Sequence, residues 1–395
     1  ASGKRWRLVR DGDTLQLAWF KTAVNSWDNA MDALLGFAAT TGRNVAKIVF
    51  PRGTVQFKKP IILDYRKNWF LEGQGGHGAS GSVLDFNIPR SAGYGEYGAI
   101  HCWGEPFGFQ QLTLRGLMVQ GIGTRIVDPT QDEASRAYCH GVYCRTTGTL
   151  WEDVAIQNFR GAALYLDNAF DNNFNRVSVF ASGRMKDGYS YTNLDDVANP
   201  DATAYPPLLI MSTRPGDQSN FNRFFDGSIE LNNVTPFVEV RGGIQIHFTR
   251  MHSERPGGGL AEGQWPLGTF MKVGGEVWLT DCGISNFTRA IAYGPYAQMI
   301  INGCNRLSGD IYPYDTSTIG SARLKLDNTI CKGLHISSNI QGDYQISNCV
   351  LQYLNTAVIS GSTLVTNCRI NGDITVTGRA GIPLGSAGEI GRASC

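Results

Sequence analysis

The sequence predicts an all-β chain wound into a parallel β-helix, a solenoid of short strands, with one α-helix near its start. From about residue 110 onward, a short strand-like pattern recurs roughly every 20–30 residues, which is typical of β-solenoids. No continuous helix-period pattern occurs in this part of the sequence, which argues against an α/β barrel. Before it, one segment has apolar residues at helical spacing, and several short strand patterns follow that segment.

The segment after Ser26 has the pattern of a capped amphipathic helix. Ser26 can cap its first turn and Gly42 can end it. The apolar residues recur at i, i+3, i+4 and i+7, at Trp27, Ala30, Met31, Leu34, Leu35 and Ala38. Such a helix would cover the open end of a β-helix and protect its edge strands. Short strands are then predicted at 45–50, 54–57, 61–63 and 69–71.

The repeats share a polar turn residue followed by an inward-pointing residue. The inward residues are Val154, Val177, Phe224, Met251, Cys282, Cys304, Thr329, Cys349 and Cys368. The 47-residue step from Val177 to Phe224 fits two coils, or one coil plus an insertion. Equivalent residues of a solenoid stack ~4.8 Å apart, so the four cysteines should form an internal ladder of free thiols. The matching turn residues should take left-handed backbone; they are Asp281, Gly303, Asn328, Asn348 and Asn367.

Composition excludes several classes of function. The chain has 35 Lys and Arg against 34 Asp and Glu, a net charge of +1, so nucleic-acid binding through bulk charge is not expected. No apolar run approaches the ~18 residues of a membrane span, so membrane insertion is not expected. The nine cysteines show no zinc-site spacing, and we expect neither a metal nor a cofactor.

The opening segments resemble a known family. IVFPRGTVQF (48–57), KPIILD (59–64) and WFLEGQGG (69–76) follow the predicted helix, and WRLVRDGDTLQLAWF (6–20) precedes it. Together they resemble the start of the pectate-lyase-like right-handed β-helix family, most of all its bacteriophage tailspikes. The resemblance implies a right-handed parallel β-helix. It also implies a homotrimer that binds and cuts bacterial surface polysaccharide, either O-antigen or capsule.

The same resemblance implies a place and a partner. A tailspike belongs to the virion and acts outside the host cell, attached to the phage tail or baseplate through a domain that would precede Ala1. Trimer contacts would bury outward apolar strands near the C-terminus, such as 350–359. We expect residues 1–85 to hold the lead-in, the helix and the first coils. Residues 86–375 would form the main β-helix, with an insertion at about 184–207, and 376–395 a tail.

The strongest candidate site lies in two adjacent repeats. One holds Asp226 and Glu230, and the next holds Arg250, His252 and Glu254. If Met251 points inward, His252 and Glu254 point outward on either side of an inward Ser253. Carboxylates one or two rungs apart fall within the ~5–9.5 Å that glycosidases use. We expect Glu254 and either Glu230 or Asp226 to be the acid/base pair of an endo-glycosidase. The rival interpretation is a solvated, charged turn, or a surface pair of Arg250 and Glu254.

Other residues would bind the substrate. Arg250, His252 and the following Arg255 could orient it. Trp265 lies in a Gly-rich loop directly after Glu254 and could stack on a sugar, although ordinary packing explains it equally well. A long insertion on a solenoid usually sits on the binding face, so Tyr189 and Tyr191 are further candidates. Asp167 and Asp171 are better explained as turn residues.

Three alternative functions stay open. A polysaccharide lyase acting on a uronic-acid polymer would use His252 as the base, with Arg250 or Arg255 as the cation that neutralises the substrate carboxylate. A non-catalytic receptor-binding spike would use the same groove without cutting. A secreted cellular enzyme, such as an epimerase or a glucanase, would share the opening motif without being viral.

Overall fold

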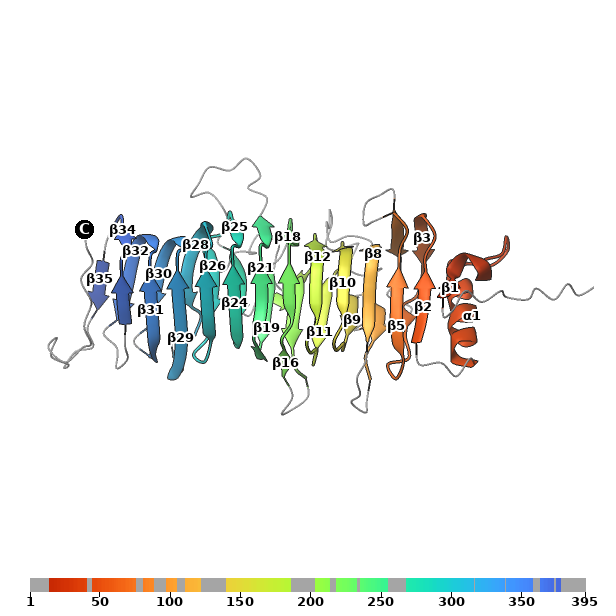
Figure 1. Ribbon diagram of the computed structural model, residues 1–395, viewed down its shortest axis with the longest axis horizontal. Coiled ribbons are helices and arrows are strands. Elements are labelled where there is room, and N and C mark those ends of the chain that lie inside the picture. The colour runs from red at the N-terminus through yellow and green to blue at the C-terminus, as the bar shows by residue number, and fades with distance from the viewer. Residues whose placement is uncertain are drawn as a thin grey trace, which may run out of the picture.

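The computed structural model describes residues 14–40, 45–75, 81–88, 97–104, 111–121, 140–185, 203–213, 218–232, 235–254, 268–315, 317–337, 339–357, 363–372 and 374–377. It confirms the predicted architecture: strands of successive coils lie side by side along one long axis, and the one α-helix of the described residues lies at the N-terminal end (Figure 1). Helix α1 spans Trp27–Thr40. The amide of Asn29 donates to Ser26 Oγ at 3.2 Å, as a helix cap does. A short 3-10 helix, η1 (Leu17–Phe20), precedes it.

Three parallel sheets run along the axis. The first sheet contains β1 (Thr14–Gln16), β2 (Val45–Val49), β5 (Asn68–Glu72), β17 (Arg223–Phe225), β21 (Ile246–Thr249), β24 (Glu276–Thr280), β27 (Gln298–Asn302), β29 (Gly320–Asp327), β31 (Ile340–Ser347) and β33 (Thr363–Thr366). Three long strands turn from the first sheet into the second, namely β8 (Leu112–Gln120), β10 (Leu150–Gln157) and β12 (Asn173–Phe180).

The second sheet adds β3 (Gly53–Phe57), β6 (Ser82–Phe86), β18 (Ser228–Glu230), β22 (His252–Glu254), β25 (Gly283–Ser285) and β34 (Arg369–Ile370). The third sheet contains β4 (Ile61–Ile62), β7 (Gly98–Cys102), β9 (His140–Cys144), β11 (Leu164–Asp167), β15 (Leu208–Met211), β19 (Val238–Arg241), β23 (Thr269–Val273), β26 (Arg289–Tyr293) and β35 (Ile374–Thr377). Toward the C-terminus, three strands run from the second sheet into the third, namely β28 (Arg306–Pro313), β30 (Ile330–Ile336) and β32 (Val350–Ala357).

Side chains alternate in and out along many of the strands, such as β24 and β29, and the inward ones stack in rows. One row of rings runs from Trp151 through Phe174 and Phe224 to Phe248, with successive ring centroids 5.1, 4.5 and 4.9 Å apart. Each of these rings is at most 2% exposed. Burying a large aromatic side chain is worth several kcal/mol, so such rows hold the coils in register.

The corner between the first and second sheets confirms the predicted left-handed position. Ten residues occupy it, with φ between 47° and 68°: Gly116, Asp153, Arg176, Asp226, Arg250, Asp281, Gly303, Asn328, Asn348 and Asn367. A residue with positive φ turns the chain sharply without adding length, and Asn and Gly tolerate it best. Two arginines occur there, and each is paired with an aspartate of the coil before it: Arg176 with Asp153 and Arg250 with Asp226.

The cysteine ladder is confirmed, and one alignment is corrected. Cys282, Cys304, Cys349 and Cys368 are buried and free, with Thr329 in the same row. However, the residue that follows the corner in β18's coil is Gly227, because Ser228 pairs with Ser178 and His252. Phe224 belongs to the aromatic row instead. The long step is therefore one coil plus an insertion, and β13 (Arg184–Met185) pairs antiparallel with β14 (Thr203–Tyr205) in the inserted stretch.

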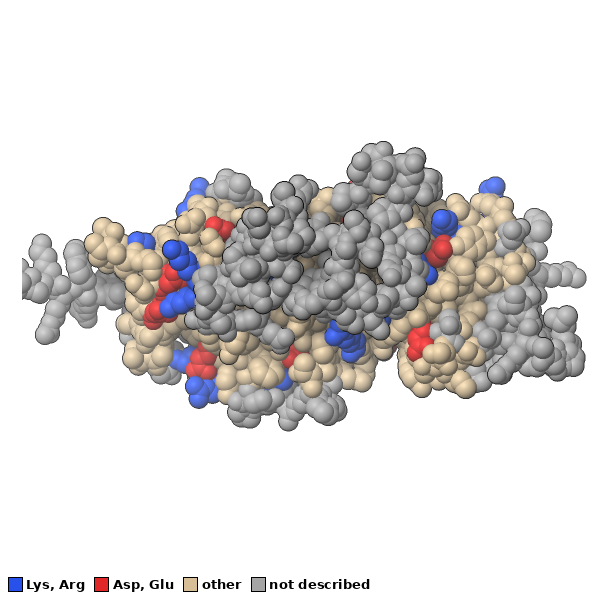
Figure 2. All heavy atoms as spheres, turned by 180° about the vertical axis from the view of Figure 1, so that it is seen from behind, with Lys and Arg blue, Asp and Glu red and all other residues tan. Residues whose placement is uncertain are grey.

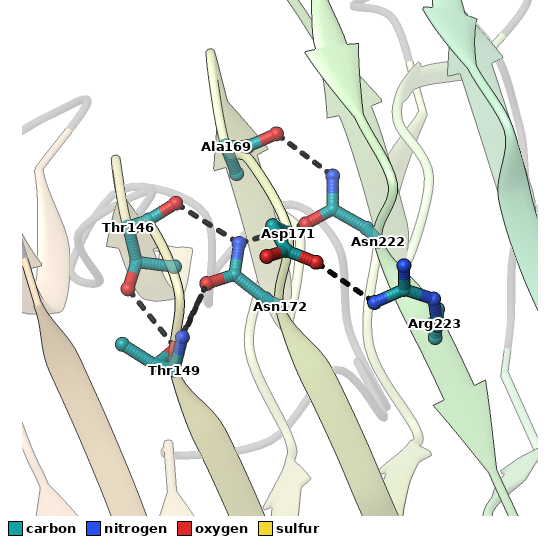
Figure 3. A network of polar contacts seen from close by, with 7 residues as sticks. All are labelled: Thr146, Thr149, Ala169, Asp171, Asn172, Asn222 and Arg223. Atoms are coloured by element: carbon teal, nitrogen blue, oxygen red, sulfur yellow. Dashed lines mark hydrogen bonds and ion pairs between the residues drawn. The ribbon is translucent and has the colours of Figure 1, made fainter.

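Buried asparagines connect the third sheet to the first. Asn172 Nδ2 donates to the Thr146 carbonyl and to Asn222 Oδ1, and Asn172 Oδ1 accepts from Thr149 (Figure 3). Asn222 in turn donates to the Ala169 carbonyl. These bonds satisfy backbone carbonyls that would otherwise be buried without a partner. On the outer side of the same corner, Arg223 pairs with Asp171, which supports the turn interpretation of Asp171. Two short strands also pair here, β16 (Ser219–Asn220) and β20 (Gly243–Ile244).

The segment expected to supply apolar trimer contacts turns two of its leucines inward. Leu351 and Leu354 are 0% and 4% exposed and belong to the core, because the strand alternation turns them inward. Exposed apolar residues of the C-terminal coils include Ile319, Ile330, Leu364 and Ile374.

The described surface carries mixed charge. On the face seen in Figure 2, the coloured Lys and Arg side chains lie beside Asp and Glu side chains. This agrees with the balanced composition of the whole chain. Within the described residues, no helix is long and apolar enough to cross a membrane.

Candidate active site

Glu230, His252 and Glu254 meet on the outer face of the second sheet. Ser228 pairs with His252, so Glu230 and Glu254 occupy the same position on neighbouring coils, at the ends of β18 and β22. His252 Nε2 lies 3.8 Å from Glu230 Oε1 and 3.8 Å from Glu254 Oε2. The alternation predicted for this strand is confirmed, because Ser253 is 0% exposed while the His252 and Glu254 side chains are 56% and 47% exposed.

Asn286 fixes one of the two carboxylates. Its Nδ2 donates to Glu254 Oε1 at 3.0 Å from the next coil. Glu254 thus has one oxygen held by an amide and the other facing His252. Glu230 is the less exposed of the pair, at 23%.

Asp226 and Arg250 lie at the other end of these strands. Both occupy the left-handed corner, where Arg250 Nε and Nη2 donate to the two Asp226 carboxylate oxygens at 2.6 and 2.8 Å. This bidentate contact with Arg250 holds the pKa of Asp226 below its ordinary value. A carboxylate kept ionised in this way cannot act as a general acid at neutral pH. Asp226 could still be the ionised member of an acid/base pair, but its contact with Arg250 holds both side chains at the corner, away from His252. Glu230, which lies beside His252, is the better partner for Glu254.

The remaining sequence candidates, Arg255, Trp265, Tyr189 and Tyr191, lie outside the described residues. Their predicted roles stay predictions.

The outward row that contains the two glutamates continues toward the N-terminus with groups suited to sugars. Phe180 pairs with Glu230, and Gln157 and Gln120 follow on the two preceding coils. Gln157 Nε2 donates to Gln120 Oε1 at 2.8 Å. A half-exposed ring and a pair of amides beside two carboxylates can supply both a stacking surface and hydrogen bonds to hydroxyls.

Sequence reasoning missed a second cluster, which lies on the third sheet. It begins in the coil that follows the coil of Glu254. His335 Nε2 lies 3.8 Å from Asp310 Oδ2 and 3.3 Å from Tyr353 Oη. The guanidinium of Arg289 lies over the ring of Tyr312, 4.3 Å from its centroid. These residues come from β26, β28, β30 and β32. Only the strand register brings them together. The signal in the sequence is the outward alternation of these strands on the third sheet.

A third polar group lies under the outer face of the third sheet, nearer the N-terminus. The rings of Tyr143 and Tyr165 stack 4.4 Å apart. Asp167, which sequence reasoning treated as a turn residue, is 0% exposed and accepts from Tyr143 Oη and from both the amide and hydroxyl of Thr213. His140 Nδ1 accepts from the Ala162 amide at 2.9 Å. His140 is 2% exposed, so this group is part of the scaffold.

Acid should weaken the fold through His140. Burial lowers the pKa of His140 to about 3, against an ordinary 6.5 in the unfolded chain, so between these values the unfolded chain binds the extra proton. The contribution of His140 to the free energy of unfolding is therefore fully present above pH 6.5. It decreases as the pH falls, by about 2 kcal/mol at pH 5. Burial also lowers the pKa of His101, to about 4, and adds to the effect.

Guanidinium unfolding of the wild type and of His140→Asn at pH 7 and pH 5 checks this. Asparagine keeps an acceptor for the Ala162 amide but does not titrate, so the variant should lose less stability between the two pH values. An equal loss in both proteins would contradict the prediction.

An open hollow of about 320 Å³ lies elsewhere, on the first sheet. It is lined by Glu276, Trp278, Gln298, Met299, Ile300, Arg323, Leu324, Lys325, Asp343 and Gln345. None of the residues that contact His252 lines this hollow, so we do not assign it to the acid cluster.

Comparison with known proteins supports the fold. No protein-family model matches the chain, and no curated protein sequence matches it. Among solved structures, ORF18 of Geobacillus virus E2 is similar over 93% of this chain, with a TM-score of 0.55 and 14% identity. The chain has the fold of a right-handed parallel β-helix. This β-helix spans 61% of the length of ORF18.

Two further β-helix structures are similar at lower scores. The A-module of the mannuronan C-5 epimerase AlgE4 of Azotobacter vinelandii aligns with 96% of this chain and 100% of its own, at 11% identity and a TM-score of 0.46. The catalytic unit of a GH87 α-1,3-glucanase from Streptomyces thermodiastaticus aligns with 93% of this chain and 69% of its own, at 14% identity and a TM-score of 0.39.

Proposed function

We propose that this β-helix is a tailspike-type depolymerase that hydrolyses internal glycosidic bonds of bacterial O-antigen or capsule. The observation that carries the proposal is the in-register pair of outward carboxylates, Glu230 and Glu254, on either side of His252. Each glutamate has one oxygen 3.8 Å from the same nitrogen, so those two oxygens are at most about 7.6 Å apart, which is close enough for the ~5–9.5 Å separation of glycosidase carboxylates.

The chemistry divides between the two carboxyl groups. One must carry a proton and give it to the leaving glycosidic oxygen, while the other, ionised, attacks the anomeric carbon or activates a water. A saccharide that covers the site would displace water from the two neighbouring carboxylates. Because two negative charges then repel each other more strongly, the pair would favour the state that holds one proton. His252 can hydrogen-bond to whichever carboxylate is ionised.

The lyase alternative has weaker support at this position. A lyase needs a cation to neutralise the substrate carboxylate, and Arg250 already pairs with Asp226 at the far end of the strands. Arg255, the other candidate cation, lies outside the described residues. A homotrimer, a place on the virion and attachment to a phage tail or baseplate belong to the same proposal, and the fold similarity to a phage protein supports its viral part.

Product mass spectrometry tests the reaction class. We expect incubation with a panel of bacterial surface polysaccharides to release oligosaccharides that have each gained one water. Shortened products that carry an unsaturated sugar and no added water would replace the hydrolase by a lyase. A polymer that binds but stays intact would leave a receptor-binding spike.

A further inference from the structure

The cluster on the third sheet contains two polar groups that lack hydrogen-bond partners. The guanidinium of Arg289 is half-buried, yet its one close partner among the described residues is the ring of Tyr312. Asp310 Oδ1 is buried and accepts no hydrogen bond from the described residues. A buried carboxylate oxygen and a half-buried guanidinium without partners are both costly. They come from the same position on neighbouring coils, since Arg289 pairs with Asp310.

The rest of the cluster holds these two groups in place. Asp310, Gly333 and Tyr353 occupy one outward row on successive coils. Gly333 leaves the space that the Tyr353 ring fills, because a Cβ there would lie 2.3 Å from ring atoms. Tyr353 Oη and His335 Nε2 are 3.3 Å apart, and His335 Nε2 is 3.8 Å from Asp310 Oδ2. Asp310 Oδ2 therefore faces His335, and it is this oxygen, rather than the buried Oδ1, that is left for a ligand.

Asp310 is also charged. Burial opposes its ionisation, but the neighbouring His335 imidazole and Tyr353 hydroxyl outweigh burial and hold the pKa of Asp310 below its ordinary value. Burial, and then the nearby Asp310, raise the pKa of Tyr353, so the phenol keeps its proton. The cluster thus presents an anionic acceptor beside a cationic donor.

The cluster is continuous with the acid pair. Asn286, which donates to Glu254, is followed after two residues by Arg289, the first residue of β26. The chain turns there from the second sheet to the third. The cluster then extends over four coils, roughly 14 Å at ~4.8 Å per coil. A polymer held at Glu230 and Glu254 would reach Arg289 by passing over this edge.

We propose that Arg289 and Asp310, supported by His335 and Tyr353, form a saccharide-binding subsite next to the acid pair. The sugar would donate a hydroxyl hydrogen bond to Asp310 Oδ2 and offer Arg289 an acceptor oxygen, from a hydroxyl or a carboxylate. This subsite rests on the proposed function, because it binds the same polymer on one side of the bond that is cut.

Binding to a catalytically silent protein tests the subsite. The probe is the polysaccharide that the panel identifies, and Kd is measured on Glu254→Gln alone and combined with Arg289→Met or Asp310→Asn. Hydrogen bonds to charged groups contribute ~1.5–3 kcal/mol, so each second substitution should weaken binding about 10- to 100-fold. Arg66→Met, an exposed arginine of the N-terminal coils, is the control and should leave Kd unchanged. Circular dichroism melting confirms that each variant is folded.

The outcomes separate the two proposals. Unchanged Kd in both Arg289→Met and Asp310→Asn, with cleavage by the wild type intact, would overturn the subsite and leave the hydrolase standing. Weaker binding in both, to a polymer that the wild type never cuts, would support the subsite and overturn the hydrolase. No binding to any polymer of the panel would overturn both. Loss of binding with rising salt would identify the acceptor as a carboxylate, and insensitivity to salt would identify a hydroxyl.

Discussion

Replacing Glu254 by Gln should lower kcat on the cleaved polysaccharide by a factor of about 10² to 10⁴, while Kd for the polymer changes little. A positioned acid or base contributes a rate factor of this size. Glutamine keeps the shape of the side chain, and its oxygen can still accept the hydrogen bond that Asn286 donates to Glu254 in the wild type. Glu230→Gln should behave similarly, because both carboxyl groups are needed.

The matched control for this experiment is Asp153→Asn. Asp153 is also a carboxylate on the outer surface, at the left-handed corner, and it pairs with Arg176. Its substitution should leave kcat and Kd unchanged. Steady-state kinetics that follow the release of reducing ends give kcat, and calorimetry gives Kd, for both glutamine variants and this control. Full activity in Glu254→Gln would exclude the acid pair, and the active site would then have to be sought elsewhere on the β-helix.

Replacing Phe224 by Ala should lower the free energy of unfolding by about 3–5 kcal/mol. Phe224 is 2% exposed and stacks between Phe174 and Phe248. Its loss opens a cavity at the centre of the aromatic row and removes a ring neighbour from both adjoining coils. In a solenoid, stability is a sum over coils and the contacts between adjacent coils, so a defect in the middle weakens two such contacts together.

Phe225→Ala is the control, because this neighbour points outward from the same strand. It should change the free energy of unfolding by less than about 1 kcal/mol. Guanidinium unfolding, followed by tryptophan fluorescence and circular dichroism, gives both values. Similar shifts in the two variants would mean that the aromatic row is not the source of coil stability.

The fold could be predicted because each coil of a solenoid repeats the same pattern of turn residues and inward residues. The corner from Asp281 to Asn367 was identifiable from residues that tolerate positive φ, and the cysteine ladder followed from the same alignment. Gly227 was misplaced for a physical reason as well. Its coil lacks the apolar residue that marks the position elsewhere, and the nearest ring, Phe224, took its place in the alignment.

The site was harder to predict because contacts between coils depend on register and on the ends of strands. Alternation correctly turned His252 and Glu254 outward and Ser253 inward. It could not show that Asp226 lies at the corner, paired with Arg250. The chain passes there from the first sheet to the second within a few residues, and no residue pattern marks that short turn. Arg289, Asp310, His335 and Tyr353 span 65 residues of chain, and only the pairing of four strands makes them neighbours.

The strict rung-to-rung pairing also determines where this chain can change in length during evolution. Strand pairing joins each coil only to the coil before and the coil after it, so duplication or deletion of one whole coil near either end would leave the strand pairing of the other coils unaltered. A coil added between β18 and β22 would instead move Glu230 and Glu254 apart by another ~4.8 Å. Descendants of this sequence should therefore vary in coil number at their ends and keep these two strands adjacent.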